Sequence, residues 1–552
     1  MFNQVLDPFN NLGLTTLAAL IPIIVLLVLL AVFRLSAWLA TLIGSILTLL
    51  VAIFFWHMPA SQGIQSYLIG SANGIWAVDW ITFWGLIIFN TLKLTGLFDT
   101  LKDWLIRQAT ADIRVQAILL AWALGALLEG LVGFGYPWAV IAPILVALGV
   151  LELDAIRVAA IANNAPVSYG ALGAPIIALS TVTGLGLLTL SASVGRVVAV
   201  LALLPPWILI YLVTGRKGFR EGWPLALVGS LAYIAGQFPV SQFLGPYLPD
   251  VAGALVCFGA LLLLLRFWKP KTVLGYGGVE LSENEQQARI AASIGLSEEQ
   301  QAQAAESGET PTRQPIWAAF LPFLILIVVV VLWTGPWSPL PKIISFSFKV
   351  LATSSINGKS TNVAFNYAPF IGGTSILVSW LVMLAFIRPS ASVLGQVFRD
   401  TFRQMWGALL VGIFIFGLAY VFNYSGMGSS LATGFKQVGP WFILLAPILG
   451  WIGVALSGSN TSANSLFGLV QFQVGKLLGF PILLFPTLNS VGAEVGKPVA
   501  PQTASVGVST SKYVRDEGQV IRHNLGWTLV LLGWLIIVGL LYYFLAPNLM
   551  QG

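Results

Sequence analysis

Long apolar runs recur along the chain, separated by short polar segments that carry most of the charge. Examples are "LTTLAALIPIIVLLVLLAVF", "AWLATLIGSILTLLVAIFFW" and "IWAAFLPFLILIVVVVLW". A helix that crosses a bilayer needs about 20 residues of this kind. We count roughly a dozen or more such runs, several of them interrupted by Gly and Pro. The pattern predicts an all-α polytopic membrane protein with broken transmembrane helices.

The composition supports this fold class and excludes several functions. Of the 552 residues, 57% are hydrophobic and 9% are charged, whereas a soluble domain has about 25% charged residues. One cysteine and two histidines exclude a disulfide framework and a Cys- or His-ligated metal site, so we expect neither a metal nor another cofactor. The net charge of +6 is spread over loops between spans and does not indicate nucleic-acid binding. With no Ser–His pair and no nucleotide loop, an enzyme is not expected.

Basic residues predict the orientation of the spans. They gather in loops at 216–220, 266–313 and 388–403, and these loops fall on one side if two spans separate each from the next. The positive-inside rule makes that side cytoplasmic. The longest hydrophilic stretch, 271–315, is rich in Glu, Gln, Ala and Ser. It is predicted to be a partly disordered cytoplasmic loop that joins two halves of the chain.

An internal repeat relates these two halves. In the first, "LKLTGLFDTL" precedes "LLEGLVGFGYP" and then "ANNAPVSYGALGAP"; in the second, "FNYSGMGSSL" precedes "LSGSNTSANS" and then "LNSVGAEVGKPVAPQ". Gly96 and Glu129 are 33 residues apart, and Gly426 and Ser457 are 31 apart. Three ordered landmarks at similar spacing favour a repeat over chance similarity of Gly-rich helices.

The two halves run in opposite directions through the membrane. Basic residues place Gly96 on the cytoplasmic side and Gly426 outside. Inverted repeats with broken helices are typical of secondary transporters, whose site lies where the breaks meet near the midplane. The expected segments are 1–78 (N-terminal scaffold helices), 79–215 (first inverted repeat, with a hairpin and a broken helix), 216–270 (scaffold helices), 271–315 (cytoplasmic loop), 316–400 (scaffold helices and an external loop), 401–515 (second inverted repeat) and 516–552 (C-terminal transmembrane helix).

The run "SGSNTSAN" at 457–464 places polar side chains between two apolar stretches. Such a run is tolerated at membrane depth only when it is buried in protein or lines a cavity that contains water. Helix–helix packing through small residues is the structural alternative, but so many polar groups favour a ligand site. The hairpin tip also exposes the N-terminus of the next helix, which attracts anions. The predicted ligand residues here are Ser459, Asn460, Thr461, Ser462 and Asn464.

Glu129 is a carboxyl group within an apolar segment, "AWALGALLEGLVGFG". An ionisable group at this depth is a functional candidate. It either carries a proton or caps backbone N–H groups at a hairpin tip, and the sequence leaves both roles open. Gly133, Phe134 and Gly135 follow it, and we expect a flexible turn here that contributes to substrate binding.

Two later breaks complete the predicted site. The first offers Asn163, Asn164 and Tyr169, in a segment where proline prevents a continuous helix. The second offers Lys497, a cation that can bind a substrate carboxylate, pair with Glu129 or Glu494, or extend to the interface from a helix end. Gln502 is a further candidate ligand in this break, and Glu494 is a second candidate for proton coupling. Asp79 is expected at an interface, outside the site.

At these breaks the sequence resembles the bacterial L-lactate/glycolate permease family. The segments "LLEGLVGFGYP", "NNAPVSYGALGAP", "NYSG", "GSNTSANSLFG" and "GKPVAPQ" carry the likeness, which extends over essentially the full chain. Glu494 and Asp79 stand where the resemblance does not lead us to expect acids. The matching residues are Glu129, Gly133, Phe134, Gly135, Asn163, Pro166, Gly173, Pro175, Ser459, Asn460, Thr461, Ser462, Asn464, Gly496, Lys497, Pro501 and Gln502.

The resemblance implies proton-coupled symport of small 2-hydroxymonocarboxylates (L-lactate, D-lactate and glycolate) across the bacterial inner membrane. It also implies two re-entrant hairpins, elevator-type motion and a homodimer. A sodium-coupled carboxylate symporter remains an alternative, because backbone carbonyls at helix breaks also hold Na⁺. A passive monocarboxylate channel is the other alternative.

Overall fold

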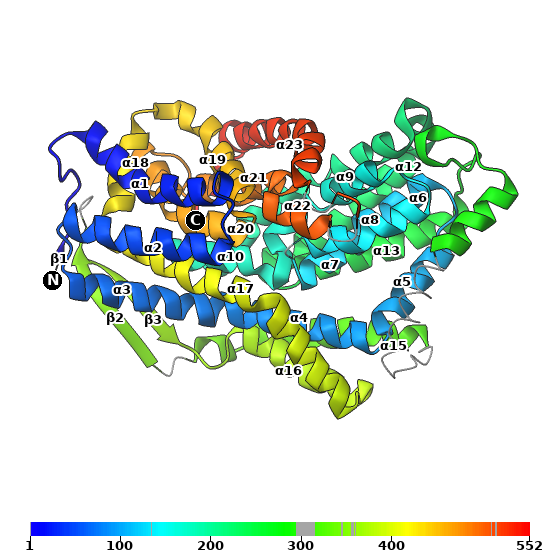
Figure 1. The fold of residues 1–552 in the computed structure, drawn as a ribbon, viewed down its shortest axis with the longest axis horizontal. Coiled ribbons are helices and arrows are strands. Elements are labelled where there is room, and N and C mark those ends of the chain that lie inside the picture. The colour runs from blue at the N-terminus through cyan, green and yellow to red at the C-terminus, as the bar shows by residue number, and fades with distance from the viewer. Residues whose placement is uncertain are drawn as a thin grey trace.

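The computed structural model describes residues 2–133, 135–293, 315–343, 346–354, 358, 360–508, 511–513 and 516–552. Within these ranges, nine helices are long and apolar enough to cross a membrane, or eleven spans if each of two sharply bent helix pairs counts as one. The prediction of an all-α polytopic membrane protein is therefore confirmed for the helical body. Figure 1 shows this body as an elongated bundle of many packed helices.

The first half of the chain supplies the N-terminal helices, one hairpin and one broken helix. Its helices are α1 (Leu12–Ala31), α2 (Ala37–Phe54), α3 (Ala60–Asn73), η1 (Gly74–Asp79), α4 (Trp80–Leu94), α5 (Leu97–Gln108), α6 (Ile113–Gln116), η2 (Ala117–Leu124), α7 (Gly125–Leu131), α8 (Tyr136–Ala147), α9 (Glu152–Ala162), η3 (Val167–Tyr169), α10 (Gly170–Thr183), α11 (Leu187–Leu201), α12 (Pro205–Phe243) and α13 (Pro249–Phe267).

The second half repeats the order of a long helix, a hairpin and a broken helix. Its helices are η4 (Tyr276–Gly278), α15 (Ile316–Thr334), η5 (Leu340–Lys342), α16 (Gly372–Ile387), α17 (Ala391–Tyr424), α18 (Met427–Lys436), η6 (Gly439–Trp441), α19 (Phe442–Ser457), α20 (Asn460–Leu478), α21 (Leu484–Gly496), η7 (Lys497–Val499), α22 (Pro501–Gly507), α23 (Glu517–Leu545) and η8 (Pro547–Met550).

A long wall forms one side of the bundle. Helices α3, η1 and α4 follow one another without a loop, and α17 packs along all three. In Figure 1 this wall lies below the helices that carry the breaks. Close approach depends on glycine, because a Cβ at Gly70 would lie 2.4 Å from the Phe416 carbonyl oxygen. Small residues allow helices to approach closely where lipid gives no hydrophobic drive for association.

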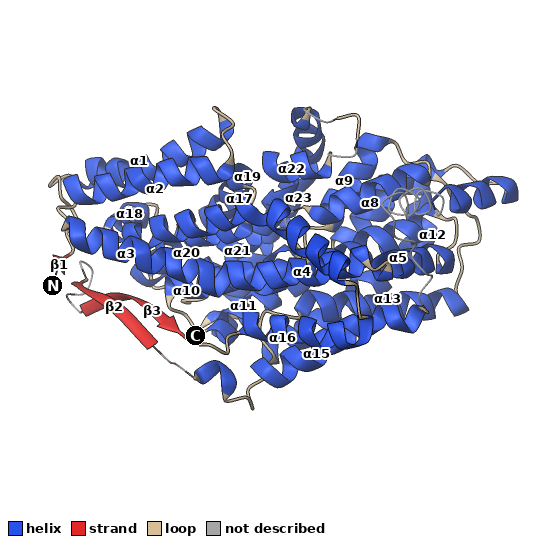
Figure 2. Cartoon of the chain, turned by 60° about the horizontal axis from the view of Figure 1, so that its bottom comes forward, coloured by secondary structure: helices blue, strands red, loops and turns tan. Residues whose placement is uncertain are grey.

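A small sheet lies outside the helical body, and the pattern of the sequence does not predict it. Strands β2 (Phe346–Thr353) and β3 (Ser360–Tyr367) form an antiparallel pair, and β1 (Phe2–Asn3) adds to β2 in parallel. Figure 2 shows the sheet at one end of the molecule, beside the N-terminus. The hairpin occupies the stretch expected to be an external loop. Its side chains are mostly exposed, so no long apolar run marks it.

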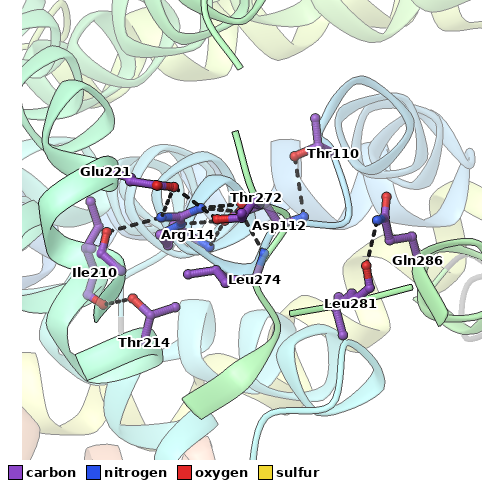
Figure 3. A network of polar contacts seen from close by, with 11 residues as sticks. Thr110, Asp112, Arg114, Ile210, Thr214, Glu221, Thr272, Leu274, Leu281 and Gln286 are labelled. Carbon is purple, nitrogen blue, oxygen red and sulfur yellow. Dashed lines mark hydrogen bonds and ion pairs between the residues drawn. The ribbon is translucent and has the colours of Figure 1, made fainter. Parts of the chain in front are cut away.

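A buried ion pair holds part of the long hydrophilic loop against the first half (Figure 3). Asp112 accepts hydrogen bonds from the backbone N–H and the Nε of Arg114, both at 2.9 Å, and from the Leu274 N–H at 3.0 Å. Arg114 donates to the Thr272 carbonyl at 2.9 Å and to the Gly218 carbonyl at 3.2 Å. Both charged side chains are fully buried, and their remaining hydrogen-bonding groups are satisfied by backbone.

The loop continues across the ends of neighbouring helices. Tyr276 donates a hydrogen bond to Asp154 at 2.6 Å, and Arg289 donates to the Leu148 carbonyl at 2.9 Å. Burial and the Asp154 hydrogen bond raise the pKa of Tyr276 to about 12. Residues 272–293 of the expected loop are therefore folded against the body. Residues 294–314 of the same loop lie outside the described part of the chain, so its partial disorder stays a prediction.

Replacing Arg114 with Met leaves Asp112 buried without its cationic partner. Loss of one member of a buried ion pair costs about 3–5 kcal/mol. We expect Arg114→Met to lower the unfolding midpoint of the purified protein in detergent, measured by thermal or denaturant unfolding. Arg107→Met, at an exposed position of α5, is the matched control. Equal midpoints for the two variants would show that the pair does not stabilise the fold.

Candidate functional site

The first hairpin is formed by α7 and α8, which end and begin on either side of a turn. Gly133 and Gly135 adopt φ of 70° and 75°, which glycine reaches at no steric cost. A Cβ at Gly135 would lie 2.6 Å from the Thr503 Cγ2. The tip of this hairpin therefore contacts α22. Phe134, expected to take part in substrate binding, lies outside the described residues.

The second hairpin answers why "SGSNTSAN" interrupts apolar sequence. Helix α19 ends at Gly458, which has φ 73°, and Ser459 caps α20 by accepting a hydrogen bond from the Ser462 N–H at 3.3 Å. A Cβ at Gly458 would lie 2.8 Å from Gln502 Oε1. The polar run is thus the tip of a hairpin and the first turn of a helix, and it contacts the same helix, α22, as the first tip does.

Two broken helices run beside the hairpins. The chain is bent by 67° between α9 and the segment Val167–Thr183. Within α10, Ala171 and Leu172 adopt φ of 47° and 56°, a region that L-residues with a Cβ rarely occupy. Strained backbone of this kind concentrates at ligand sites and switch regions. In the other half, α21 and α22 are separated by η7, which carries Lys497.

Glu129 and Lys497 form an ion pair across these elements. The Lys497 Nζ lies 2.5 Å from Glu129 Oε1, and Asn163 donates a hydrogen bond to Glu129 Oε2 at 2.9 Å. Both charged residues are buried, with exposed fractions of 2% and 4%. The sequence left three roles open for Lys497, and in this structure it pairs with Glu129. The contact joins α7 of the first half to η7 of the second.

Glu494 lies in the packed interior of the second half. Ser168 donates a hydrogen bond to its Oε2 at 2.5 Å and lies 3.3 Å from the Ser490 hydroxyl. Its other oxygen, Oε1, has no hydrogen-bond partner among the described residues. Glu494 and Lys497 are three residues apart in sequence, yet Lys497 bonds to Glu129, which belongs to α7 of the first hairpin.

A network of amides holds the second hairpin to both broken helices. Asn464 donates to the Pro175 carbonyl at 2.9 Å and to the Ser490 hydroxyl at 3.1 Å. Asn489 donates to Asn464 Oδ1 at 2.9 Å, and Asn460 donates to the Ser490 carbonyl at 3.1 Å. These bonds replace the backbone partners lost at the breaks, which lipid cannot supply. They fix the relative positions of α10, α20 and α21.

A cavity of about 650 Å³ lies where the hairpins and broken helices meet. Its lining combines the ion pair, the polar hairpin tip and the start of α10 with part of the long wall. Glu129 and Asn460, which lie 331 positions apart in sequence, face this same space. Of the predicted site residues, those in the lining are Glu129, Gly133, Ser459, Asn460, Thr461, Ser462, Lys497 and Gln502.

The other predicted ligands lie behind this lining. Tyr169 is fully buried and donates its hydroxyl to the Ser191 carbonyl at 2.6 Å. Asn164 donates to the Ile161 carbonyl, and Asn163 bonds to Glu129. Asn464 belongs to the amide network. These side chains support the break and are not among the residues that line the cavity, and their contact with substrate stays a prediction.

Two buried acids are not predicted as site residues from the sequence. Asp79, expected at an interface, has an exposed fraction of 5% and lines the cavity. Asp250 lies behind the first hairpin, accepts a hydrogen bond from the Tyr233 hydroxyl at 2.9 Å, and has its Cβ where a side chain on Gly130 would be. Asp250 follows "GPYLP" at the start of a helix, a place typical of exposed first-turn acids. Its burial could not be foreseen from that pattern.

Comparison with known proteins identifies the family. The L-lactate permease family matches residues 15–549. The chain belongs to the L-lactate permease family. It is 32% identical to the glycolate permease GlcA of Escherichia coli K12, over 100% of this chain and 99% of the relative. It is 33% identical to an L-lactate permease of Bacillus subtilis 168, over 97% of each.

Membership in this family makes the chain a multi-pass protein of the bacterial inner membrane and a transporter rather than an enzyme. Among solved structures, the YdaH transporter of Alcanivorax borkumensis covers 89% of this chain and 90% of its own, at 16% identity and a TM-score of 0.46. That score is too low to support an argument about function.

The ion pair depends on the absence of a side chain at Gly170. A Cβ there would lie 2.5 Å from Glu129 Oε1, inside contact distance of the atom that binds Lys497. We expect Gly170→Ala to displace the Glu129 carboxylate and to reduce transport at least tenfold, a loss of about 1.4 kcal/mol. Initial uptake rates in proteoliposomes measure this. Gly395→Ala, at a helical position with open space around it, is the control, and equal rates for both variants would contradict the prediction.

Proposed function

We propose that the protein is a secondary active transporter that couples proton movement to symport of small 2-hydroxymonocarboxylates, namely L-lactate, D-lactate and glycolate. The observation that carries the proposal is the Glu129–Lys497 ion pair in the wall of the cavity. The names of the relatives, an L-lactate permease and a glycolate permease, indicate the substrate class.

The cavity offers what a small hydroxy acid requires. Lys497 is a cation in the lining of the cavity, and the first turn of α20 presents backbone N–H groups to the same cavity. Cations and helix N-termini both favour a carboxylate. Hydroxyl and amide groups of Ser459, Asn460 and Thr461 can donate to or accept from the substrate hydroxyl.

The ion pair supplies a physical route to coupling. Lys497 cannot bind a substrate carboxylate fully while Glu129 occupies it at 2.5 Å. A proton on Glu129 removes the negative charge that holds the lysine, which then becomes available to the anion. When the proton leaves, the pair re-forms and the anion loses its partner. Proton and anion therefore bind together and leave together.

Glu494 keeps a place in the proposal as a buried carboxyl group near the coupling pair. It contacts η3 through Ser168, next to the break in the first half. Glu494 is not among the residues that line the cavity, so in this proposal it acts on the pair through the broken helices rather than by touching the substrate. Its role in proton coupling remains a prediction.

The proposed mechanism includes inverted repeats and elevator motion. The order of a hairpin and then a broken helix occurs in both halves. The basic residues near 93–114 and 399–403 predict that the two halves begin on opposite sides of the membrane. The amide network binds the second hairpin to both broken helices, and the bonds of Glu129 to Asn163 and Lys497 add the first hairpin. We infer that these elements move as one body along the wall of α3, η1, α4 and α17. A homodimer is the predicted assembly.

Replacing Glu129 with Gln removes the titratable partner of Lys497 but retains its shape. We expect Glu129→Gln to reduce strongly the lactate accumulation driven by a pH gradient and to leave lactate counterflow measurable, because counterflow needs no net proton movement. Uptake of labelled L-lactate into proteoliposomes measures both. Glu285→Gln, an exposed acid, is the control. Loss of both activities would instead make Glu129 a structural cap.

The same vesicles distinguish the coupling ion and the passive alternative. A proton symporter accumulates lactate under an inward proton gradient, and an uncoupler abolishes this. Accumulation that follows only an imposed Na⁺ gradient would favour the sodium-coupled symporter. Equilibration without accumulation under either gradient would favour the channel.

Replacing Lys497 with Ala removes the cation proposed for the substrate carboxylate. A hydrogen bond to a charged group contributes about 1.5–3 kcal/mol, so we expect the apparent KM for L-lactate to rise roughly ten- to hundredfold. Lys476→Ala, at an exposed position near the end of α20, is the matched control. An unchanged KM in the Lys497 variant would remove this residue from the substrate site.

A further inference from the structure

Asp79 brings a further carboxyl group to the cavity, from the long wall of α3, η1, α4 and α17. It is the last residue of η1, a six-residue π-helical segment between α3 and α4. Segments of π-helix occur frequently at functional sites. The side chain is buried, lines the cavity, and has no hydrogen-bond partner for its Oδ2 among the described residues. A buried polar atom without a partner is costly, so it indicates an interaction made in another state.

The packing of the wall makes room for this carboxyl group. A Cβ at Gly412 of α17 would lie 2.3 Å from Asp79 Oδ1. The neighbouring lining residue Val411 is apolar, and Gly407 has no side chain. On its other side η1 packs against α10, the strained half of the first broken helix. Asp79 therefore lies where the long wall faces the elements that carry the ion pair.

The helices that pack against η1 carry few charged residues near Asp79. Helix α10 contains only apolar and hydroxyl residues. The phenols of Tyr67 on α3 and Tyr420 on α17 bond to Ser45 and to the Thr181 carbonyl. Lys93 is near the C-terminal end of α4, away from Asp79 at its start. The charged residues of α17 are Arg399, Asp400 and Arg403, in the first half of that helix. The charged residues that share the cavity with Asp79 are Arg34, Glu129, Lys497 and Glu517.

We propose that Asp79 is a further proton-binding group of the substrate cavity, and that the anion occupies the cavity only when Asp79 carries a proton. An ionised Asp79 would place a second negative charge beside the substrate carboxylate in a space of low dielectric, where like charges repel strongly. The protonated carboxyl group has the opposite effect, because it donates a hydrogen bond to the anion through the oxygen that otherwise lacks a partner.

The proton is taken up from water and is returned to water. It binds the Asp79 carboxylate from the aqueous side to which the cavity is open, stays there while the anion is bound, and returns to water after the anion has left. This inference rests on the proposed function. It adds that the long wall contributes a titratable group to the cavity, as the breaks do. Thermodynamic linkage then requires that anion affinity falls as pH rises through the titration of Asp79.

The test is the pH dependence of L-lactate exchange in proteoliposomes, with equal pH on both sides, from about pH 6 to about pH 9. Each linked proton raises the apparent KM about tenfold per pH unit above the point where its group ionises. We expect Asp79→Asn to reduce the steepest slope of log KM against pH by about one proton. Asp79→Glu keeps a titratable group and should restore the slope with a shifted midpoint.

Asp400→Asn is the matched control, because it removes an acid from α17 outside the cavity lining. Its slope and maximal rate should match those of the wild type. A wild-type slope in Asp79→Asn would overturn the inference and leave the proposed function intact. The proposed coupling fails by a separate result, which is a wild-type slope of log KM against pH in Glu129→Gln.

A measurement on the wild-type protein decides the matter if Asp79→Asn does not fold. Proton uptake on L-lactate binding is counted in detergent with a pH-indicator dye over the same pH range. With Glu129 and Asp79 both linked to the anion, the maximum should reach about two protons for each lactate bound. A maximum of one or fewer would overturn the inference.

Discussion

The bilayer interior offers no hydrogen-bond partners, and this constraint determines the architecture of the site. Each interruption of a helix frees backbone and side-chain polar groups that must find partners within the protein. The chain satisfies them by bringing its interruptions together. Both hairpin tips contact α22 through glycines, and the amides of the second hairpin bond to the broken helices. The cavity is the space left where these polar segments meet.

The Glu129–Lys497 ion pair is the most consequential of these contacts. A buried pair contributes little net stability, because desolvation offsets most of the attraction, although loss of one partner is costly. This balance suits a transporter, since a proton on the acid changes the preferred partner of the lysine without a large change in the total energy. The pair also spans the two halves of the chain, so its state is coupled to how the breaks pack together.

Much of the site could be predicted from sequence because the breaks contradict their surroundings. Polar runs and Gly–Pro segments inside apolar stretches locate both hairpins and both broken helices, and Glu129 and Lys497 are ionisable groups in the same stretches. The direction of each side chain could not be predicted. Tyr169 and Asn464 occur within the breaks but lie behind the lining, because their partners are backbone carbonyls of other helices, in the case of Asn464 one 289 positions away in sequence.

Asp79 shows the opposite case. It stands between tryptophans in "WAVDW", a composition typical of the membrane interface, and nothing local indicates that α17 has a glycine opposite it. The β2–β3 hairpin was missed for a related reason, because its exposed strands carry no long apolar run. In both cases the deciding information is a contact between distant segments.

The central claim is that anion binding and protonation of Glu129 are one event. Infrared difference spectroscopy of the purified protein, with and without L-lactate, tests it most directly. We predict that lactate produces a protonated-carboxyl C=O band that is lost in Glu129→Gln. Identical difference spectra for the wild type and this variant would contradict the account.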